Sequence, residues 1–174
     1  MVLYNNMLQS LFRSQIRTIG MTVILLMTMF LVLFRSLKIS LIALFPNLLS
    51  SLLVLGILGL LKIPLDMMTI TIVAISVGIA VDNTIHYINR FRREFAQNGD
   101  YWQTMHICHG SIGNAMYYTS ITIIVGFSIL SFSNFIPTTL FGLLTGLAMA
   151  TALLGALTLL PRLIILAKPF GPGK

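Results

Sequence analysis

Long apolar runs divide this chain, and short polar or basic segments separate them. An α-helix rises about 1.5 Å per residue, so each run can cross the roughly 30 Å hydrocarbon core of a bilayer. The pattern therefore predicts an all-α, polytopic membrane helix bundle with five transmembrane helices. The expected spans are about 19–34, 39–61, 67–89, 111–133 and 138–167.

The flanking segments complete the expected domain organisation. Residues 1–18 are a polar, basic lead-in that we expect outside the cell, and residues 19–167 form the transmembrane domain. The tail, 168–174, contains too much proline and glycine to be helical and is expected in the cytoplasm.

A polar connector, 90–110, separates the third and fourth spans and is expected on the cytoplasmic side. Phe91, Phe95, Trp102 and Met105 could form the apolar edge of a helix lying along the membrane interface. An ordinary solvated connector fits the same residues.

Composition agrees with a membrane location. Of 174 residues, 57% are hydrophobic and 9% are charged, whereas soluble domains have about 25% charged residues. The single cysteine excludes an intrachain disulfide. The net charge of +7 does not indicate a nucleic-acid partner, because the basic residues lie between the apolar runs.

The distribution of basic residues predicts an orientation in the cell inner (cytoplasmic) membrane. Five crossings place the two termini on opposite sides, and the side richer in lysine and arginine should be cytoplasmic. The N-terminus is therefore expected outside and the C-terminus inside. The richer side would hold Arg35, Lys38, Arg90, Arg92, Arg93, Lys168 and Lys174, and the other Arg13, Arg17 and Lys62.

One carboxylate, Asp82, lies deep in the third apolar run. A charged side chain at the centre of a bilayer costs about 2.5–3.5 kcal/mol on insertion scales, so such a residue indicates ion or proton handling. Gly78, His86 and Asn89 share its face at helical spacing. We expect burial of Asp82 to favour its neutral form, which makes the Asp82–His86 pair a candidate proton relay.

Structural interpretations compete with this one. Asp82 could be a buried carboxylate bonded to serine or threonine hydroxyls, His86 an interfacial histidine, and Asn89 a helix-end residue. On the fourth span, the hydroxyls of Thr119 and Thr122 could reach the carboxylate. They could equally bond the carbonyls four residues earlier in their own helix.

Small residues indicate where helices approach closely. Gly142 and Gly146 lie four residues apart on the fifth span, and Gly78 lies on the third, so all three are predicted helix-packing positions. Pro161 is expected to kink the end of the fifth span.

The sequence predicts neither an enzyme nor a cofactor, the proton being the only expected coupling ion. His106, Cys108 and His109 lie together, but their spacing matches no structural zinc site. No phosphate-binding glycine loop, nucleophile elbow or HExxH motif occurs. A membrane hydrolase would need a nucleophile near His86.

Two segments resemble the resistance–nodulation–division (RND) superfamily, in its MMPL-type branch related to Patched and sterol-sensing-domain proteins. They read PNLLSSLLVLGILGLLKIPLDMMTITIVAISVGIAVDNTIHYINRFRRE and SIGNAMYYTSITIIVGFSILSFSNFIPTTLFGLLTGLAMATALLGALTLLPRLIIL. The more specific part is GIAVDNTIHYINRFRRE together with the preceding IPLDMMTIT. The resemblance extends from about residue 11 to residue 171.

The resemblance implies more than the residue pattern does. Such transporters have twelve spans in two halves, and this chain resembles the last five helices of the second half, without its first helix and extracytoplasmic domain. Acidic residues on the fourth helix of each half form the proton relay, a position that Asp82 matches. Hydroxyls on the following helix often assist, which implies roles for Thr119 and Thr122.

The resemblance therefore implies the membrane portion of a proton-driven exporter of lipids or hydrophobic compounds, as a fragment or one part of a split transporter. Expected partners are membrane lipids and either a first-half RND polypeptide or further copies of the chain. The alternative is a non-transporting, sterol-sensing-like lipid-binding or assembly subunit.

Overall fold

The computed structural model describes the backbone of residues 2–61 and 67–171, and the side chains of residues 17–61 and 70–171. Within these ranges the chain forms helices and short turns without strands. The helices are α1 (Val2–Phe34), α2 (Leu37–Leu60), α3 (Met67–Asn98), α4 (Tyr101–Cys108), α5 (Asn114–Ile129), α6 (Ile136–Leu154) and α7 (Leu160–Ala167). Two π turns, η1 (His109–Gly113) and η3 (Gly155–Leu159), and the 3₁₀ turn η2 (Leu130–Phe132) connect some of them.

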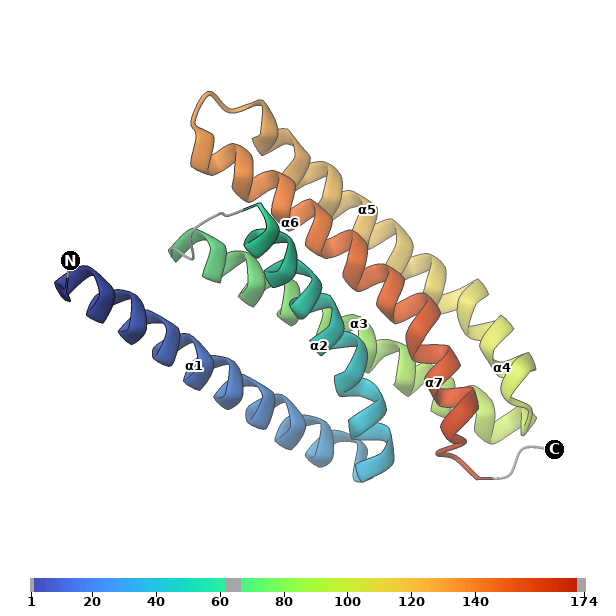
Figure 1. The fold of residues 1–174 in the computed structure, drawn as a ribbon. Helices are drawn as coiled ribbons and strands as arrows, with labels where there is room; N and C mark the ends of the chain where they lie inside the picture. The colour runs from blue at the N-terminus through green and yellow to red at the C-terminus, as the bar shows by residue number, and fades with distance from the viewer. Residues whose placement is uncertain (1, 62–66, 172–174) are drawn as a thin grey trace.

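The described helices form five lengths of chain that are long and apolar enough to cross a bilayer, as predicted. The α4–η1–α5–η2 path makes the fourth and α6–η3–α7 the fifth. Chain neighbours pack against each other, α1 on α2, α2 on α3 and α5 on α6, and α6 also packs on α3 (Figure 1). Helix α2 also packs on α6, so α2, α3 and α6 meet one another in the bundle.

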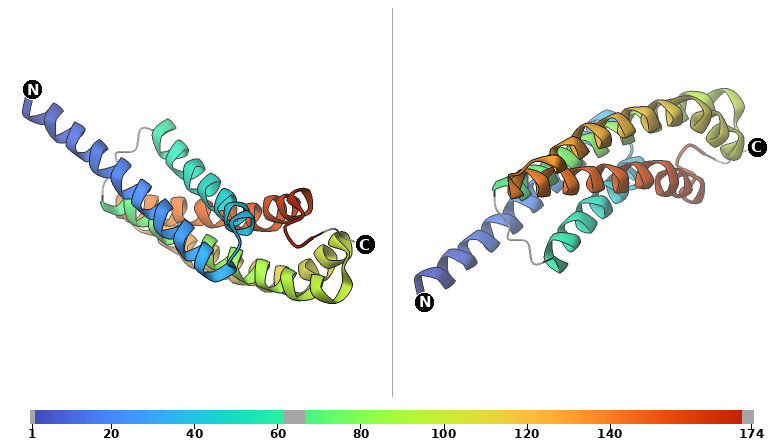
Figure 2. Two further views of the ribbon diagram at one scale, coloured as in Figure 1. Left: turned by 90° about the horizontal axis from the view of Figure 1, so that it is seen from below. Right: turned by 90° about the horizontal axis from the view of Figure 1, so that it is seen from above.

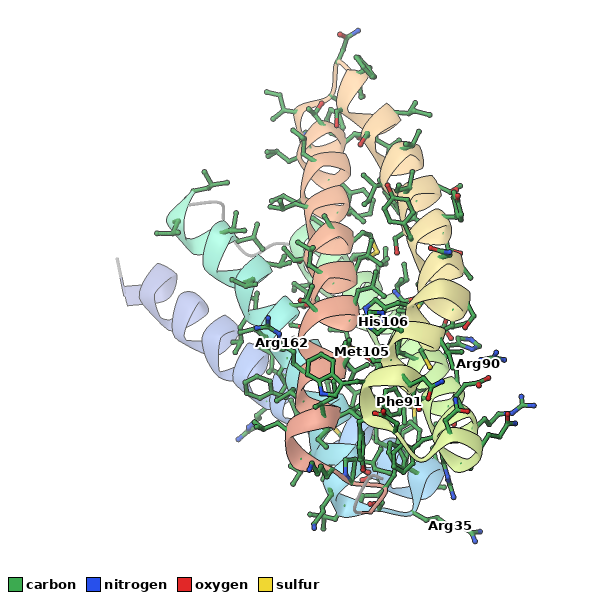
Figure 3. The ribbon with its side chains drawn as sticks, turned by 90° about the vertical axis from the view of Figure 1, so that its right-hand side faces the viewer. Arg35, Arg90, Phe91, Met105, His106 and Arg162 are labelled. Carbon is green, nitrogen blue, oxygen red and sulfur yellow. The ribbon has the colours of Figure 1, made fainter. Side chains whose placement is uncertain are left out.

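The two ends of the bundle differ. Figure 1 and Figure 2 place the N-terminus and the C-terminus at opposite ends, as expected for an odd number of crossings. The turns after α1 and after α3 lie at the C-terminal end, and the turn before α6 lies at the other. Figure 3 shows Arg35 at the end that carries the α1–α2 turn, and Arg90 further along the bundle but closer to this end than to the other. The predicted connection at 62–66, with Lys62 and Pro64, and the tail residues 172–174 lie outside the described residues.

Local backbone chemistry ends the first and third helices. Arg35 has φ 49° and Gly99 has φ 71°, so each turns the chain in the left-handed region after a helix. Glycine adopts this conformation without steric cost. The Asp100 side chain then accepts a hydrogen bond from the Trp102 amide at 2.8 Å and caps α4.

The connector between the third and fourth spans is mostly helical and folds back on itself. Helix α3 continues to Asn98, and α4 folds back along it. The reason is an aromatic cluster in which Phe91, Phe95, Tyr101 and Phe170 stack on one another, with ring centroids 4.3–6.4 Å apart. Aromatic pairs at such distances stabilise beyond the area they bury, so the connector becomes part of the packed end of the bundle.

Residues 168–171 of the tail are non-helical, as predicted, and α4 holds them in place. The Tyr101 hydroxyl donates to the Gly171 carbonyl at 2.9 Å and accepts a bond from the Phe170 amide at 3.1 Å. Both partners lie about 70 positions away along the chain.

The fifth span departs from regular α-helix near its end, where proline was expected to kink it. Pro161 lies in the first turn of α7, and the π turn η3 directly precedes it. A proline inside a helix lacks an amide and its ring crowds the carbonyl four residues earlier. The wider π turn accommodates that carbonyl, which belongs to Leu157.

A polar contact fastens α2 to α3 inside the bundle. Asn47 is 2% exposed, and its amide donates to Thr84 Oγ1 at 3.2 Å and to the Ala43 carbonyl at 2.7 Å. Thr84 in turn donates to the Ala80 carbonyl at 2.8 Å. Every one of these donors is therefore satisfied, as buried polar groups require.

Candidate proton-binding site

The predicted polar stripe on α3 exists, and it points away from the bundle. Gly78, Asp82, His86 and Asn89 are all exposed. Asn83 and Thr84, which directly follow Asp82 in the sequence, are buried against the neighbouring helices. Because an α-helix turns about 100° per residue, packing one face inward leaves the other outward.

Asp82 and His86 form a pair on this outward face. The Asp82 Oδ1 to His86 Nε2 distance is 3.4 Å, and their side chains are 69% and 61% exposed. This distance is longer than the 2.7–2.9 Å typical of a charge-assisted hydrogen bond. At this length the two groups lie close together without forming a short, charge-assisted hydrogen bond.

The described residues do not bury Asp82 as expected. The interior position that burial would require is taken by Asn83 and Thr84, the latter bonded to Asn47 of α2. If Asp82 is covered, a surface from outside the described residues must cover it.

The two threonines of the fourth span do not complete this pair. Thr119 Oγ1 donates to the Ala115 carbonyl and Thr122 Oγ1 donates to the Tyr118 carbonyl, both at 2.9 Å. Both side chains are exposed, and α5 packs chiefly on α6. The structure therefore matches the second interpretation above, in which each hydroxyl bonds its own helix.

The three glycines predicted to mediate packing differ. A Cβ added at Gly142 would lie 2.5 Å from the Phe127 carbonyl oxygen, so α5 and α6 are in backbone contact there. At Gly146 the nearest atoms, on Ile124 and Ser128, would be 3.9 Å away. A Cβ at Gly78 would meet nothing within 4 Å, so Gly78 makes no close approach to the described residues.

His109 has a role that the sequence did not reveal. Its Nε2 lies 2.9 Å from the Leu157 carbonyl oxygen, and its Nδ1 lies 3.0 Å from the Met105 carbonyl oxygen and 3.2 Å from the Tyr87 hydroxyl. The signal that could have found it is Pro161, which deprives the Leu157 carbonyl of its usual helical donor. Among the described residues no group of three metal-binding side chains occurs.

Arg162 is a second residue that the sequence analysis passed over. It is a cation within the fifth span and lies exposed on α7 (Figure 3). Its long side chain can carry the charge toward the polar headgroups, as arginines near helix ends do.

A family model describes this sequence. The model of the MMPL family matches residues 2–173. The chain belongs to the MMPL family. This membership confirms the resemblance noted from the sequence and indicates a transporter-related membrane protein.

Two proteins similar to this MMPL chain are known as membrane proteins. MJ1562 of Methanocaldococcus jannaschii is 29% identical over 155 residues, which are 89% of this chain and 39% of that protein. YdgH of Bacillus subtilis is 30% identical over 167 residues, which are 91% of this chain and 18% of that protein. The chain thus spans less than half of either relative. No solved structure matches it.

Proposed function

We propose that this chain is the membrane portion of a proton-driven MMPL-type exporter of lipids or hydrophobic compounds, working as a fragment or as one part of a split transporter. The observation that carries the proposal is the Asp82–His86 pair, 3.4 Å apart on the exposed face of a helix long and apolar enough to cross a membrane. In this proposal Asp82 binds the proton and His86, one turn along α3, passes it toward the cytoplasm. The cytoplasmic side is the end of the bundle that carries Arg35 and Arg90.

The exposure of the pair supports a partner that covers it. A carboxylate facing acyl chains is penalised by about 2.5–3.5 kcal/mol, so a stable assembly covers Asp82 with protein or a water-filled path. Gly78, one turn away, has open space before it that would admit a neighbouring helix at close range. The proposed partner is a first-half RND polypeptide, or a second copy of this chain, seated on the α3 stripe.

Proton flux through reconstituted vesicles tests the relay. The chain, purified in mild detergent with whatever polypeptides remain bound, is placed in vesicles that enclose a pH-sensitive dye, and a pH gradient is imposed. Asp82→Asn should reduce proton flux to the level of empty vesicles, because an amide cannot take up the proton. Glu94→Gln is the matched control, since Glu94 is also an acid on α3 but pairs with Arg90 at 2.8 Å. Flux in Asp82→Asn equal to that of the unaltered chain would contradict the proposal, as would an unaltered chain without flux.

Disulfide cross-linking identifies the partner. The native cysteine, Cys108, is buried, so an added cysteine reports its own position. If two copies meet along the stripe, Gly78→Cys forms a covalent dimer under mild oxidation, whereas Leu143→Cys on the exposed side of α6 does not. A dimer from both variants, or from Leu143→Cys alone, would contradict pairing of copies along α3. No dimer from either would favour a different polypeptide.

A non-transporting lipid-binding subunit is the second candidate, and one cavity in the structure favours it. A cavity of about 240 Å³ lies between α1, α2 and α3, with mostly apolar walls and Asn47 among its lining residues. The volume of this cavity suits a single acyl chain of a lipid better than a drug-sized ligand, which commonly occupies a pocket of about 300–1,000 Å³. This candidate predicts that Asp82→Asn leaves lipid binding and stability unchanged and that the unaltered chain conducts no protons.

A further inference from the structure

His109 lies where four structural elements meet, namely α3, α4, η1 and η3. It begins η1, directly after α4, and its ring is half-buried. Tyr87 of α3 approaches the ring edge-on, with centroids 5.8 Å apart, and its side chain is fully buried. On the opposite side the ring reaches the Leu157 carbonyl of η3.

The Leu157 carbonyl is available for this contact because of the residue four positions later. In a regular α-helix this oxygen would accept the amide of residue 161, which is a proline without an N–H. The His109 Nε2 approaches it at 2.9 Å, a normal N–H···O length. Gly113 reinforces the contact, because a Cβ there would lie 3.6 Å from the Leu157 side chain. The two π turns, η1 and η3, therefore lie directly against each other.

The ring faces more acceptors than a neutral imidazole can serve. A neutral histidine has one N–H, and the Leu157 carbonyl at Nε2 calls for it. The Nδ1 lone pair can then accept the Tyr87 hydroxyl at 3.2 Å, but it also faces the Met105 carbonyl oxygen at 3.0 Å. When Nδ1 takes up a proton, it gains an N–H that can donate to the Met105 carbonyl oxygen. The hydrogen bond from Nε2–H to the Leu157 carbonyl oxygen then becomes charge-assisted and stronger.

We propose that His109 is a second proton-binding site of this protein, separate from Asp82 and His86, and that proton uptake at its Nδ1 holds η1 more tightly against η3. The step consumes one proton and leaves every covalent bond of the protein intact. Tyr87 marks the change, since its hydroxyl donates to the neutral ring and must turn its proton away from the charged one. The inference does not depend on the proposed transport function.

Hydrogen bonds, rather than neighbouring charged side chains, form the immediate surroundings of the His109 ring. Tyr87 is the titratable side chain in contact with the ring among the described residues, and η3 and α6 carry no ionisable side chains. Arg90 and Glu94, further along α3, pair with each other. Of the other ionisable groups on the adjoining elements, Cys108 and Tyr101 are buried. The exposed ones are Asp82, His86, Arg92, Arg93, His106, Tyr117, Tyr118 and Arg162.

Nitrogen NMR and amide exchange test the proposal together. The chain has three histidines, so the double variant His86→Gln/His106→Gln retains His109 as its only imidazole. With ¹⁵N-labelled histidine in lipid bilayers, one ring nitrogen should carry a proton at pH 8 and both should at pH 5, each hydrogen-bonded. Amide protection in residues 155–160, corrected for the intrinsic effect of pH, should rise about fivefold between the same two pH values, since charged hydrogen bonds are roughly twice as strong.

A variant and a control separate this linkage from a general effect of acid. His109→Gln cannot take up a proton, so the gain in protection of residues 155–160 should vanish. His106→Gln, an exposed histidine on α4, should retain it. A ring that keeps one N–H at pH 5, or protection that does not change with pH in the double variant, would overturn the proposal. So would an equal gain in His109→Gln.

Discussion

The contact between α5 and α6 at Gly142 leads to the sharpest stability prediction. Gly142 and Gly146 occupy equivalent places in one small-residue pattern, yet an added Cβ would meet atoms at 2.5 Å in the first case and 3.9 Å in the second. At Gly142 the nearest atom is the Phe127 carbonyl oxygen, and the next is Leu130 Cβ at 2.9 Å. Backbone cannot rotate aside as a long side chain can, so Gly142→Ala must push the two helices apart.

The magnitude follows from two opposing terms. Overpacking a close contact costs about 1–3 kcal/mol. Replacing a helical glycine by alanine gains about 0.5–1 kcal/mol. Gly142→Ala should therefore lower the free energy of unfolding by up to about 2.5 kcal/mol. Gly146→Ala, with ordinary contacts, should leave it unchanged or raise it by up to about 1 kcal/mol.

Reversible unfolding in mixed lipid–detergent micelles, followed by circular dichroism during titration with a denaturing detergent, measures both variants. Gly126→Ala on α5 is the control, because a Cβ there meets nothing within 4 Å. Equal stability of Gly142→Ala and Gly146→Ala, or a more stable Gly142→Ala, would refute the reasoning. That result would mean that α5 and α6 do not approach at Gly142 as the structure has them.

Two further predictions concern the packed end of the bundle. Tyr101→Phe removes both hydrogen bonds that hold the tail, one to the Phe170 amide and one to the Gly171 carbonyl. Limited proteolysis should therefore cleave the tail several times faster while the rest of the bundle stays intact. An unchanged cleavage rate would contradict this prediction. Cys108 is fully buried in the folded protein, so a maleimide should label it at least about tenfold more slowly than after unfolding, and equal labelling in both states would contradict its placement.

The sequence was sufficient to predict the five spans. In hydrocarbon a helix must satisfy its own backbone hydrogen bonds, so a long apolar run has few alternatives to an α-helix. The same local logic located the change near Pro161 and the non-helical tail, because proline and glycine act on their own backbone. The face shared by Asp82 and His86 was equally a matter of helical spacing.

Interactions between distant segments decided what sequence spacing could not. The polar connector at 90–110 became a packed helical hairpin, since Phe170 from the tail joins Phe91 and Tyr101 in one cluster. His109 was inconspicuous in the sequence because its partners, Tyr87 and Leu157, lie 22 and 48 positions away.

The sequence by itself determined that this MMPL chain is a five-span helical membrane protein with one carboxylate on a stripe of α3. Only the tertiary structure decided that the stripe faces outward and that Gly142, rather than Gly146 or Gly78, is the point of backbone contact. The physical reason is that helical periodicity says which residues share a face, while both faces of a membrane helix can be apolar. The rotation of each helix is therefore set by its neighbours, here by Asn47 bonding Thr84 and turning Asp82 away from the bundle.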